Sequence, residues 1–195
     1  MSNKKYEFTG ETKERCGHTL HRIRAIVDIA YAKAGEIGGW IESESNLYEY
    51  GDAWVYGDAV VYGNAKVYGD AKVCGNAVVC GDAWVYGDAV VYGDAEVCGN
   101  AVVCGDAEVC GNAVVCGDAK VKQSSDYIVV KNCWSSMRWF TYTRYNKKWK
   151  VGCFHGTGEE LIKKAYADSE TSGKCYEAIV RAVEVIEKAT KEDNQ

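Results

Sequence analysis

Residues 53–70 read AWVYGDAVVYGNAKVYGD, in which a six-residue unit, A-x-V-[YC]-G-[DN], occurs three times. The unit is repeated twelve times without an insertion, with alanine at every sixth position from Ala53 to Ala119 and valine at every sixth position from Val55 to Val121. A fixed period of this kind is typical of repeat architectures, in which each unit stacks on its neighbours. The repeat therefore predicts the fold of the middle of the chain.

Each unit has the composition of a short strand followed by a corner. Side chains alternate across a strand, so alanine and valine point to one side, and x and Tyr/Cys point to the other. Glycine followed by Asp or Asn suits the corner because these residues adopt turn geometry readily. Three units then close a triangular coil, and twelve units make four regular coils. We predict a mainly β protein built on a parallel β-helix with a core of valine and alanine.

The spacing Val-x-x-x-Ala, as in Val61–Ala65 and Val79–Ala83, resembles the hexapeptide repeat of left-handed parallel β-helices. The resemblance covers residues 53–121, and it implies the left-handed form. Many members of that family are acyltransferases that form trimers and use a histidine base. The repeat of this chain contains no histidine. We therefore expect no enzyme activity, no catalytic residue and no cofactor.

The 18-residue interval between coils sorts the outward side chains onto three faces. The second face carries one charge, at Glu96, among eight residues. Contiguous apolar surface of this size usually marks an interface, so we predict that the face mediates self-association, as a dimer or trimer, or docks a partner. The alternative is that the terminal segments of the chain cover it. The predicted interface residues are Val60, Tyr62, Val78, Cys80, Cys98, Val114 and Cys116.

Six of the ten cysteines replace tyrosine at one position of the repeat. This placement indicates packing, so we expect free thiols in a reducing compartment rather than a disulfide framework. Disulfides along the column of Cys80, Cys98 and Cys116 are the alternative. Parallel side chains in a column do not converge as tetrahedral zinc ligands must, so we predict no metal site.

The net charge is -5, hydrophobic residues make up 47% of the chain, and proline is absent. This composition excludes a polybasic protein and argues against long disordered linkers. No segment reaches the ~18–20 consecutive apolar residues of a membrane span, and the N-terminus lacks the apolar core of a signal peptide. We therefore expect a cytoplasmic protein that makes no contact with a membrane.

Residues 1–36 are predicted to form an N-terminal β-strand cap over the open end of the β-helix. Strands are predicted at Tyr6–Phe8 and Thr19–Ile29, on either side of a turn at residues 16–18. The two histidines of this region have no partners at metal-ligand spacing, so we interpret them as structural.

The β-helix is predicted to span residues 37–122. Ile37 lies 18 residues before Val55, which is the length of one coil. The segment 37–41 is therefore predicted to form an irregular first coil, with Ile37 in phase with the repeat valines.

Residues 123–195 are predicted to form a small α+β module with three strands and two helices. Thr157-Gly-Glu-Glu160 has the pattern of a capping box, which predicts a helix that ends near Ala167. A second helix is predicted from about Gly173 to Ala189. Its apolar residues at helical spacing are Ala178, Ala182, Val185 and Ala189. The strands are predicted at Tyr127–Lys131, Arg138–Arg144 and Lys148–Phe154.

Basic and aromatic residues are interleaved through the strand region of this module. On a sheet, such residues can bind single-stranded nucleic acid by stacking and by phosphate contacts. We favour the alternative that the aromatic side chains form the core while the charges face solvent, and an acidic protein surface is a third partner class. The candidate nucleic-acid or partner surface consists of Trp134, Arg138, Trp139, Arg144, Lys147, Lys148 and Lys150.

Nearly the whole chain resembles a broader set of Y-G-D/N-A-x-V repeat proteins found in phages and prophage-bearing bacteria. The resemblance lies in HTLHRIRAI (18–26), KAGEIGGWIESESNL (33–47), the repeats and VGCFHGTGEEL (151–161). The resemblance carries no established activity. We expect a non-enzymatic interaction protein in the bacterial host cytosol, which self-associates through the β-helix and binds a host macromolecule through the C-terminal module. In a phage or prophage context, inhibition of a bacterial defence complex is one such role. A self-assembling structural protein and a nucleic-acid-binding protein are the alternatives.

Overall fold

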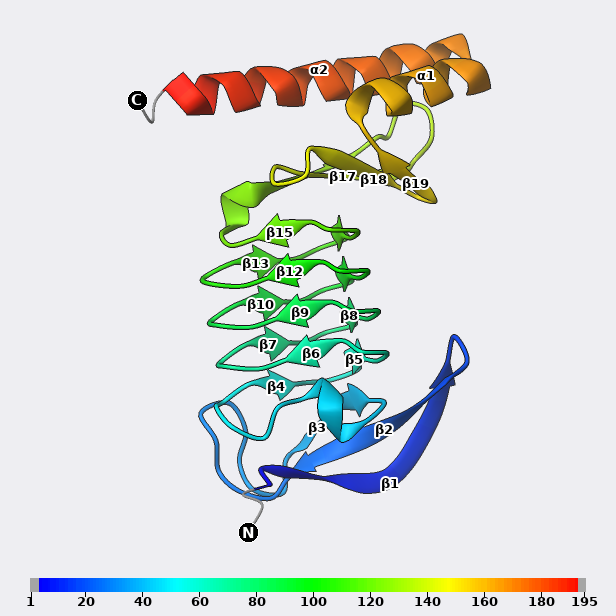
Figure 1. Ribbon diagram of the computed structural model, residues 1–195. Helices are drawn as coiled ribbons and strands as arrows, with labels where there is room; N and C mark the ends of the chain where they lie inside the picture. The colour runs from blue at the N-terminus through cyan, green and yellow to red at the C-terminus, as the bar shows by residue number, and fades with distance from the viewer. Residues whose placement is uncertain (1–3, 193–195) are drawn as a thin grey trace. The chain divides into compact units, whose positions relative to one another are not determined.

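The computed structural model describes residues 4–192 (Figure 1). The chain divides into two compact units. The first consists of Met1–Tyr127 and Arg144–Asn146, and the second of Ile128–Thr143 and Lys147–Gln195. Residues 1–3 of the predicted cap and residues 193–195 of the predicted module lie outside the described residues.

The repeat forms a parallel β-solenoid, as the six-residue unit predicts (Figure 1). Strands 18 residues apart pair in parallel, so that Val60 lies beside Val78 and Val61 beside Val79. The strands stack into one sheet for each predicted face, while the left-handed sense stays a prediction. The strands are β4 (Trp54–Val55), β5 (Val60–Val61), β6 (Lys66–Val67), β7 (Lys72–Val73), β8 (Val78–Val79), β9 (Trp84–Val85), β10 (Val90–Val91), β11 (Glu96–Val97), β12 (Val102–Val103), β13 (Glu108–Val109), β14 (Val114–Val115) and β15 (Lys120–Val121).

The interior of the solenoid consists of columns of alanine and valine. Every repeat alanine and every repeat valine from Ala53 to Val121 is fully buried. The backbone of each coil donates hydrogen bonds to the next, as Val60 N does to Ala77 O at 2.9 Å. The two inward positions of the unit are therefore confirmed.

The corners explain the Gly-Asp/Asn pair of the unit. Gly81 has φ +71°, and a Cβ atom at this position would lie 3.0 Å from the backbone nitrogen of Gly99 in the next coil. The following polar residues join successive coils, because Asn64 Nδ2 donates to Asp82 Oδ1 at 2.9 Å. An asparagine opposite an aspartate gives a hydrogen bond where two stacked carboxylates would repel.

An N-terminal hairpin extends the sheet of the second face (Figure 1). Strands β1 (Tyr6–Arg15) and β2 (His18–Ala25) pair antiparallel, and β2 pairs with β3 (Ile37–Ile41). Strand β3 then pairs in parallel with β5, which gives the order β1-β2-β3-β5-β8-β11-β14. Both predicted strands and the turn between them are present, but the predicted bounds are wrong, because β1 continues to Arg15 and β2 ends at Ala25 rather than at Ile29.

The first coil is irregular, as predicted, but its predicted phase is wrong. Ile41 pairs with Val61, and Leu47 forms a bridge to Val67, so both lie 20 residues before their partners rather than 18. Ile41 and Leu47 are fully buried, whereas Ile37 is 46% exposed. The first coil therefore contains two extra residues, which precede the regular repeat.

Two side chains supply hydrogen-bond donors at the open edge of this coil. Lys5 Nζ donates to the carbonyl oxygens of Gly51 at 3.0 Å and Ala53 at 2.8 Å. Asn46, in the 3₁₀ helix η1 (Glu44–Asn46), donates through Nδ2 to Gly63 O and Ala65 O, both at 2.9 Å. In the regular coils, the equivalent carbonyl oxygens accept hydrogen bonds from backbone amides of the preceding coil instead. Burial lowers the pKa of Lys5 to about 8.

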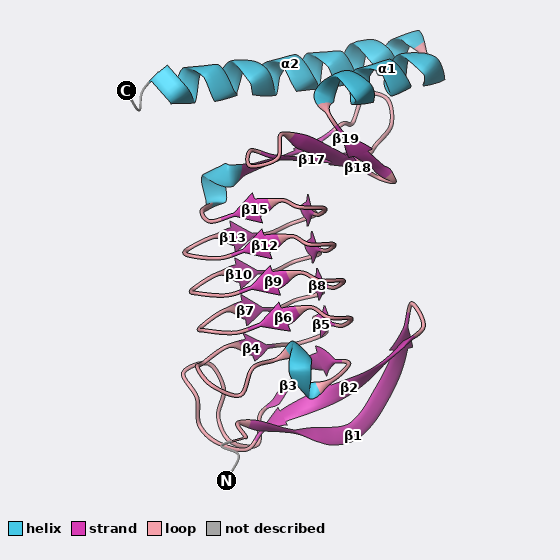
Figure 2. Cartoon of the chain, in the orientation of Figure 1, coloured by secondary structure: helices cyan, strands magenta, loops and turns pink. Residues whose placement is uncertain are grey.

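The second unit contains an antiparallel sheet and two helices (Figure 2). Thr157 caps α1 with the predicted capping box, since its hydroxyl accepts from Glu160 N at 3.3 Å. The prediction of three strands is wrong, because Gly152, at φ +54°, interrupts the last of them and the sheet has four. The elements after the solenoid are the 3₁₀ helix η2 (Ser124–Asp126), β16 (Tyr127–Lys131), β17 (Trp139–Thr143), β18 (Lys148–Val151), β19 (Phe154–Gly156), α1 (Gly158–Asp168) and α2 (Glu170–Glu192).

Candidate functional site

The hairpin covers part of the second solenoid face. Leu20 of β2 packs against Val60 and Val78, and none of these three side chains is more than 8% exposed. The prediction that Val60 and Val78 belong to an open interface is therefore wrong. The alternative prediction, that a terminal segment of the chain covers this face, is correct for these coils. The half-buried side chains packed around the cluster are Trp40, Tyr62 and Cys80.

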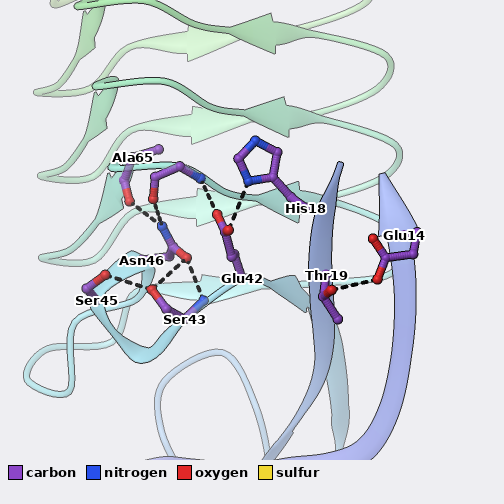
Figure 3. A network of polar contacts seen from close by, with 9 residues as sticks. Glu14, His18, Thr19, Glu42, Ser43, Ser45, Asn46 and Ala65 are labelled. Carbon is purple, nitrogen blue, oxygen red and sulfur yellow. Dashed lines mark hydrogen bonds and ion pairs between the residues drawn. The ribbon is translucent and has the colours of Figure 1, made fainter. Parts of the chain in front are cut away.

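Polar contacts hold the hairpin against the first coils (Figure 3). His18 Nδ1 lies 2.9 Å from Glu42 Oε1, and the second oxygen of Glu42 accepts a hydrogen bond from Gly63 N at 2.7 Å. The His18 ring also lies against the Tyr62 ring, with 4.8 Å between the ring centroids. These contacts agree with a structural role for His18.

Further along the second face, the predicted column of cysteines is present. The side chains of Cys80, Cys98 and Cys116 interact along this column. The interaction with Cys98, together with burial, raises the pKa of Cys80, and the interaction with Cys116 raises the pKa of Cys98 to about 12. Because the thiolate is the nucleophile, these thiols are poorly reactive near neutral pH. Val114 is half-buried and Cys116 is 8% exposed.

All ten cysteines are free thiols in the structure. Cys16, Cys133 and Cys153 are exposed, whereas Cys104 and Cys116 are buried. Within residues 4–192, no three His, Cys, Asp or Glu side chains are grouped so that they could hold a metal ion.

The predicted basic and aromatic surface is divided between the two units. Arg144 belongs to the first unit, whereas the other candidates belong to the second. Lys148 and Lys150 alternate in β18 with the buried Trp149, so they lie on the face of the sheet away from the helices. Trp134 is 75% exposed in the loop after β16. Arg138, Trp139 and Lys147 are also exposed.

Helix α2 has two apolar faces, and only one of them packs against its own unit. Tyr176, Val180 and Val183 belong to the core beneath the helix. The apolar residues that the sequence places at helical spacing face solvent instead, because Val185 is 64% exposed and Ala182 is also exposed. We define the apolar face of α2 as Ala178, Ile179, Ala182, Val185, Ile186 and Ala189.

A groove runs along this face, between α2 and the edge strand β16. Its volume is about 520 Å³. Trp134, at 75% exposure, and Ile186, at 46%, leave large apolar surfaces open to solvent. Lys174 is the charged residue among those that line it, which are Ile128, Val130, Trp134, Lys174, Cys175, Ala178, Ile179, Ala182, Val183 and Ile186.

The opposite, charged side of α2 is already engaged. Arg181 Nη1 lies 2.6 Å from Glu159 Oε1 of α1 and 3.1 Å from Glu184 Oε1. The apolar face therefore remains as the side of the helix with surface to offer another molecule. The apolar face of α2 is visible in the sequence as residues at helical spacing, but this spacing alone does not tell which of the two apolar stripes of the helix points inward.

Comparison with known proteins adds no family. No family model matches the chain, and no curated protein matches it. Among the described residues, no helix has the length and apolar character needed to cross a membrane.

Proposed function

We propose that this chain is a non-enzymatic interaction protein in which two copies pair through the apolar face of α2. The observation that carries the proposal is the exposed apolar surface on α2, where Val185 and Ile186 are 64% and 46% exposed. Surfaces of this kind are costly in water and usually mark an interface. The solenoid then acts as a rigid arm attached to a dimerising module.

The pattern of side chains on this face suits a second copy of the same helix. A two-fold pairing uses one patch twice, so the patch must complement itself. If two α2 helices pack antiparallel with Ala182 opposite its own copy, Ala178 lies opposite Ile186. A small side chain then meets a large one at each side of the centre, which allows close packing of the two helices.

The edge strand supports the same location for the contact. Strand β16 is at one edge of its sheet, so its outer backbone groups have no neighbouring strand in this unit. A helix does not pair with these backbone groups as a strand would, so the contact would use the side chains of β16. The half-buried Ile128 and Val130 of β16 line the groove, so a second α2 helix lying there would cover apolar side chains of both elements.

The wider biological role rests on the resemblance of the repeats and flanking segments to phage and prophage proteins. On that basis we propose a phage- or prophage-encoded hexapeptide-repeat protein with a left-handed solenoid, which acts in the cytoplasm of the bacterial host. There it binds a host macromolecule, and inhibition of a bacterial defence complex is one such role.

Sedimentation equilibrium over a range of concentrations tests the pairing. We expect wild type to approach twice the chain mass and Ala182→Glu to remain at the monomer mass, because two carboxylates would meet at the centre of the contact. Lys188→Ala is the matched control, since it changes the charge by the same amount at another exposed position of α2 and should still dimerise.

Two results would contradict the proposal. A wild-type mass that stays at one chain at every concentration would exclude pairing. A mass that grows without limit would instead favour the self-assembling structural protein.

A further inference from the structure

A second open surface lies on the third face of the solenoid, within the first unit. It is a groove of about 640 Å³ over the last coils. A groove of this volume is in the range of small-molecule sites. The residues that line it are Trp84, Tyr86, Val102, Cys104, Lys120, Lys122, Asp126, Arg144 and Tyr145.

Three aromatic side chains line the groove. Trp84 is 44% exposed and Tyr145 is 58% exposed, so both present ring surface to solvent. Tyr86 is fixed in place by stacking on Tyr68, with ring centroids 4.8 Å apart and an interplanar angle of 8°. The half-buried Val102 lies between Trp84 and Lys120 in the strand register and forms an apolar floor. These surfaces suit a flat ring.

Three cationic side chains line the same groove. Lys120, Lys122 and Arg144 line it together with a single carboxylate, that of Asp126. Asp126 Oδ2 accepts hydrogen bonds from the backbone nitrogens of Lys122 at 2.8 Å and Gln123 at 3.2 Å. The Asp126 carboxylate therefore holds the segment after β15 in place. With three cationic side chains and one carboxylate, the groove has an excess of positive charge in a protein whose net charge is -5.

Lys120 lies beside one of the aromatic rings. Its ammonium group lies 4.9 Å from the centroid of the Tyr145 ring, which positions a cation beside an aromatic surface. The turn that carries Tyr145 is joined to the solenoid, because Asn146 Nδ2 donates to Asp118 Oδ1 at 3.1 Å. Aromatic rings and cations therefore meet in one groove with defined walls.

We propose that this groove binds a mononucleotide, with the base stacked on Trp84 and the phosphate held by Lys120, Lys122 and Arg144. Base stacking on aromatic side chains and phosphate pairing with Lys and Arg are the usual contacts for such a ligand. The corner next to this face carries a row of carboxylates, Asp70, Asp88 and Asp106. A long polynucleotide would run into this row and be repelled, whereas a single nucleotide fits at the cationic end.

Isothermal titration calorimetry with AMP tests the assignment on the full-length chain. We expect wild type to bind AMP, and Trp84→Ala and Lys122→Ala each to bind about tenfold more weakly. Lys72→Ala, an outward lysine on the first face, should bind as wild type does. Both test residues are exposed, so the variants should fold, and their melting temperatures check this.

Separate titrants distinguish the parts of the ligand. Adenosine and inorganic phosphate should each bind more weakly than AMP, because each offers one half of the contacts. The inference is overturned if millimolar AMP gives no binding, if both groove variants bind as wild type does, or if a single-stranded oligonucleotide binds more tightly than AMP. The monomeric variant Ala182→Glu should still bind AMP, so failure of the pairing and failure of this site give different results.

Discussion

The second solenoid face and the apolar face of α2 are similar in sequence and differ in structure. Both are regular and predominantly apolar rows of side chains. On the solenoid, Leu20 covers Val60 and Val78, and all three are at most 8% exposed. On α2, Val185 and Ile186 keep 64% and 46% of their surface exposed.

The difference shows what an apolar period predicts and what it leaves open. Periodicity identifies the residues that need cover, because apolar surface is costly in water. It does not identify the segment that supplies the cover. The first coils of the second face are covered by the chain itself, and the apolar face of α2 is therefore the stronger candidate for a second molecule.

The largest loss of stability is expected for a charge placed at an inward position of the solenoid, because the outward faces exist only if the valines point inward. Val91 is fully buried, whereas its neighbour Val90 points outward between Lys72 and Glu108. Val91→Asp should lower the free energy of unfolding by ~4 kcal/mol or more, because it buries a charge without a partner. Val90→Asp should cost about 1 kcal/mol. Urea unfolding followed by circular dichroism measures both, and equal losses would refute the assignment.

Removing the cover of the second face comes next. Leu20→Ala should lower the free energy of unfolding by about 3 kcal/mol, since it deletes a fully buried side chain from the cluster with Val60 and Val78. Thr19→Ala, at the exposed neighbouring position, should cost about 0.5 kcal/mol or less. Chemical denaturation of the two variants provides the comparison. If Leu20→Ala is as stable as Thr19→Ala, the hairpin does not cover the face.

A smaller effect is expected at the corners, whose uniform geometry keeps the faces in register. Gly81 and Gly111 both have positive φ, at +71° and +65°, but only Gly81 faces crowded backbone, with a Cβ position 3.0 Å from Gly99 N. Gly81→Ala should cost about 2 kcal/mol and Gly111→Ala about 1 kcal/mol. Thermal melts of the pair measure the difference. If Gly111→Ala were the less stable variant, crowding between stacked corners would not be the cause of the difference in stability.

The smallest effect concerns the cysteines beyond the hairpin on the second face. The pKa of Cys98 is raised from about 9 to about 12 by its interaction with Cys116. An acid with a raised pKa stabilises the fold below the unfolded value, and this contribution is lost as the pH rises from about 9 to about 12. Wild type should therefore lose more stability between pH 8 and pH 10 than Cys98→Ser, measured by urea unfolding. Equal losses would show that the thiol is not protected.

The sequence predicted the solenoid well because every coil repeats the same constraints. The inward valines, the three outward faces and the corners follow from a six-residue period, and the structure confirms them. The phase of the first coil was predicted wrongly because this coil lies before the repeat begins. Ile37 has the right distance from Val55, yet Ile41 and Leu47 occupy the inward positions.

The candidate surfaces were only partly predictable. Trp84, Lys120 and Lys122 fall on one face by their period, but Arg144 and Tyr145 come from a turn far along the chain, and no period places them. In α2, two apolar stripes have helical spacing, and tertiary packing selects the one that contains Tyr176 and Val180. Sequence patterns thus locate the residues within elements, while contacts between elements decide which remain exposed.

A charge swap at Ala182 tests whether α2 pairs with its own copy about this residue. Ala182→Glu and Ala182→Lys should each remain monomeric alone, because like charges meet at the two-fold axis. An equimolar mixture should form a heterodimer, because opposite charges then meet. Sedimentation equilibrium of each variant and of the mixture gives the masses. A dimer formed by either variant alone, or a mixture that stays monomeric while wild type dimerises, would contradict the account.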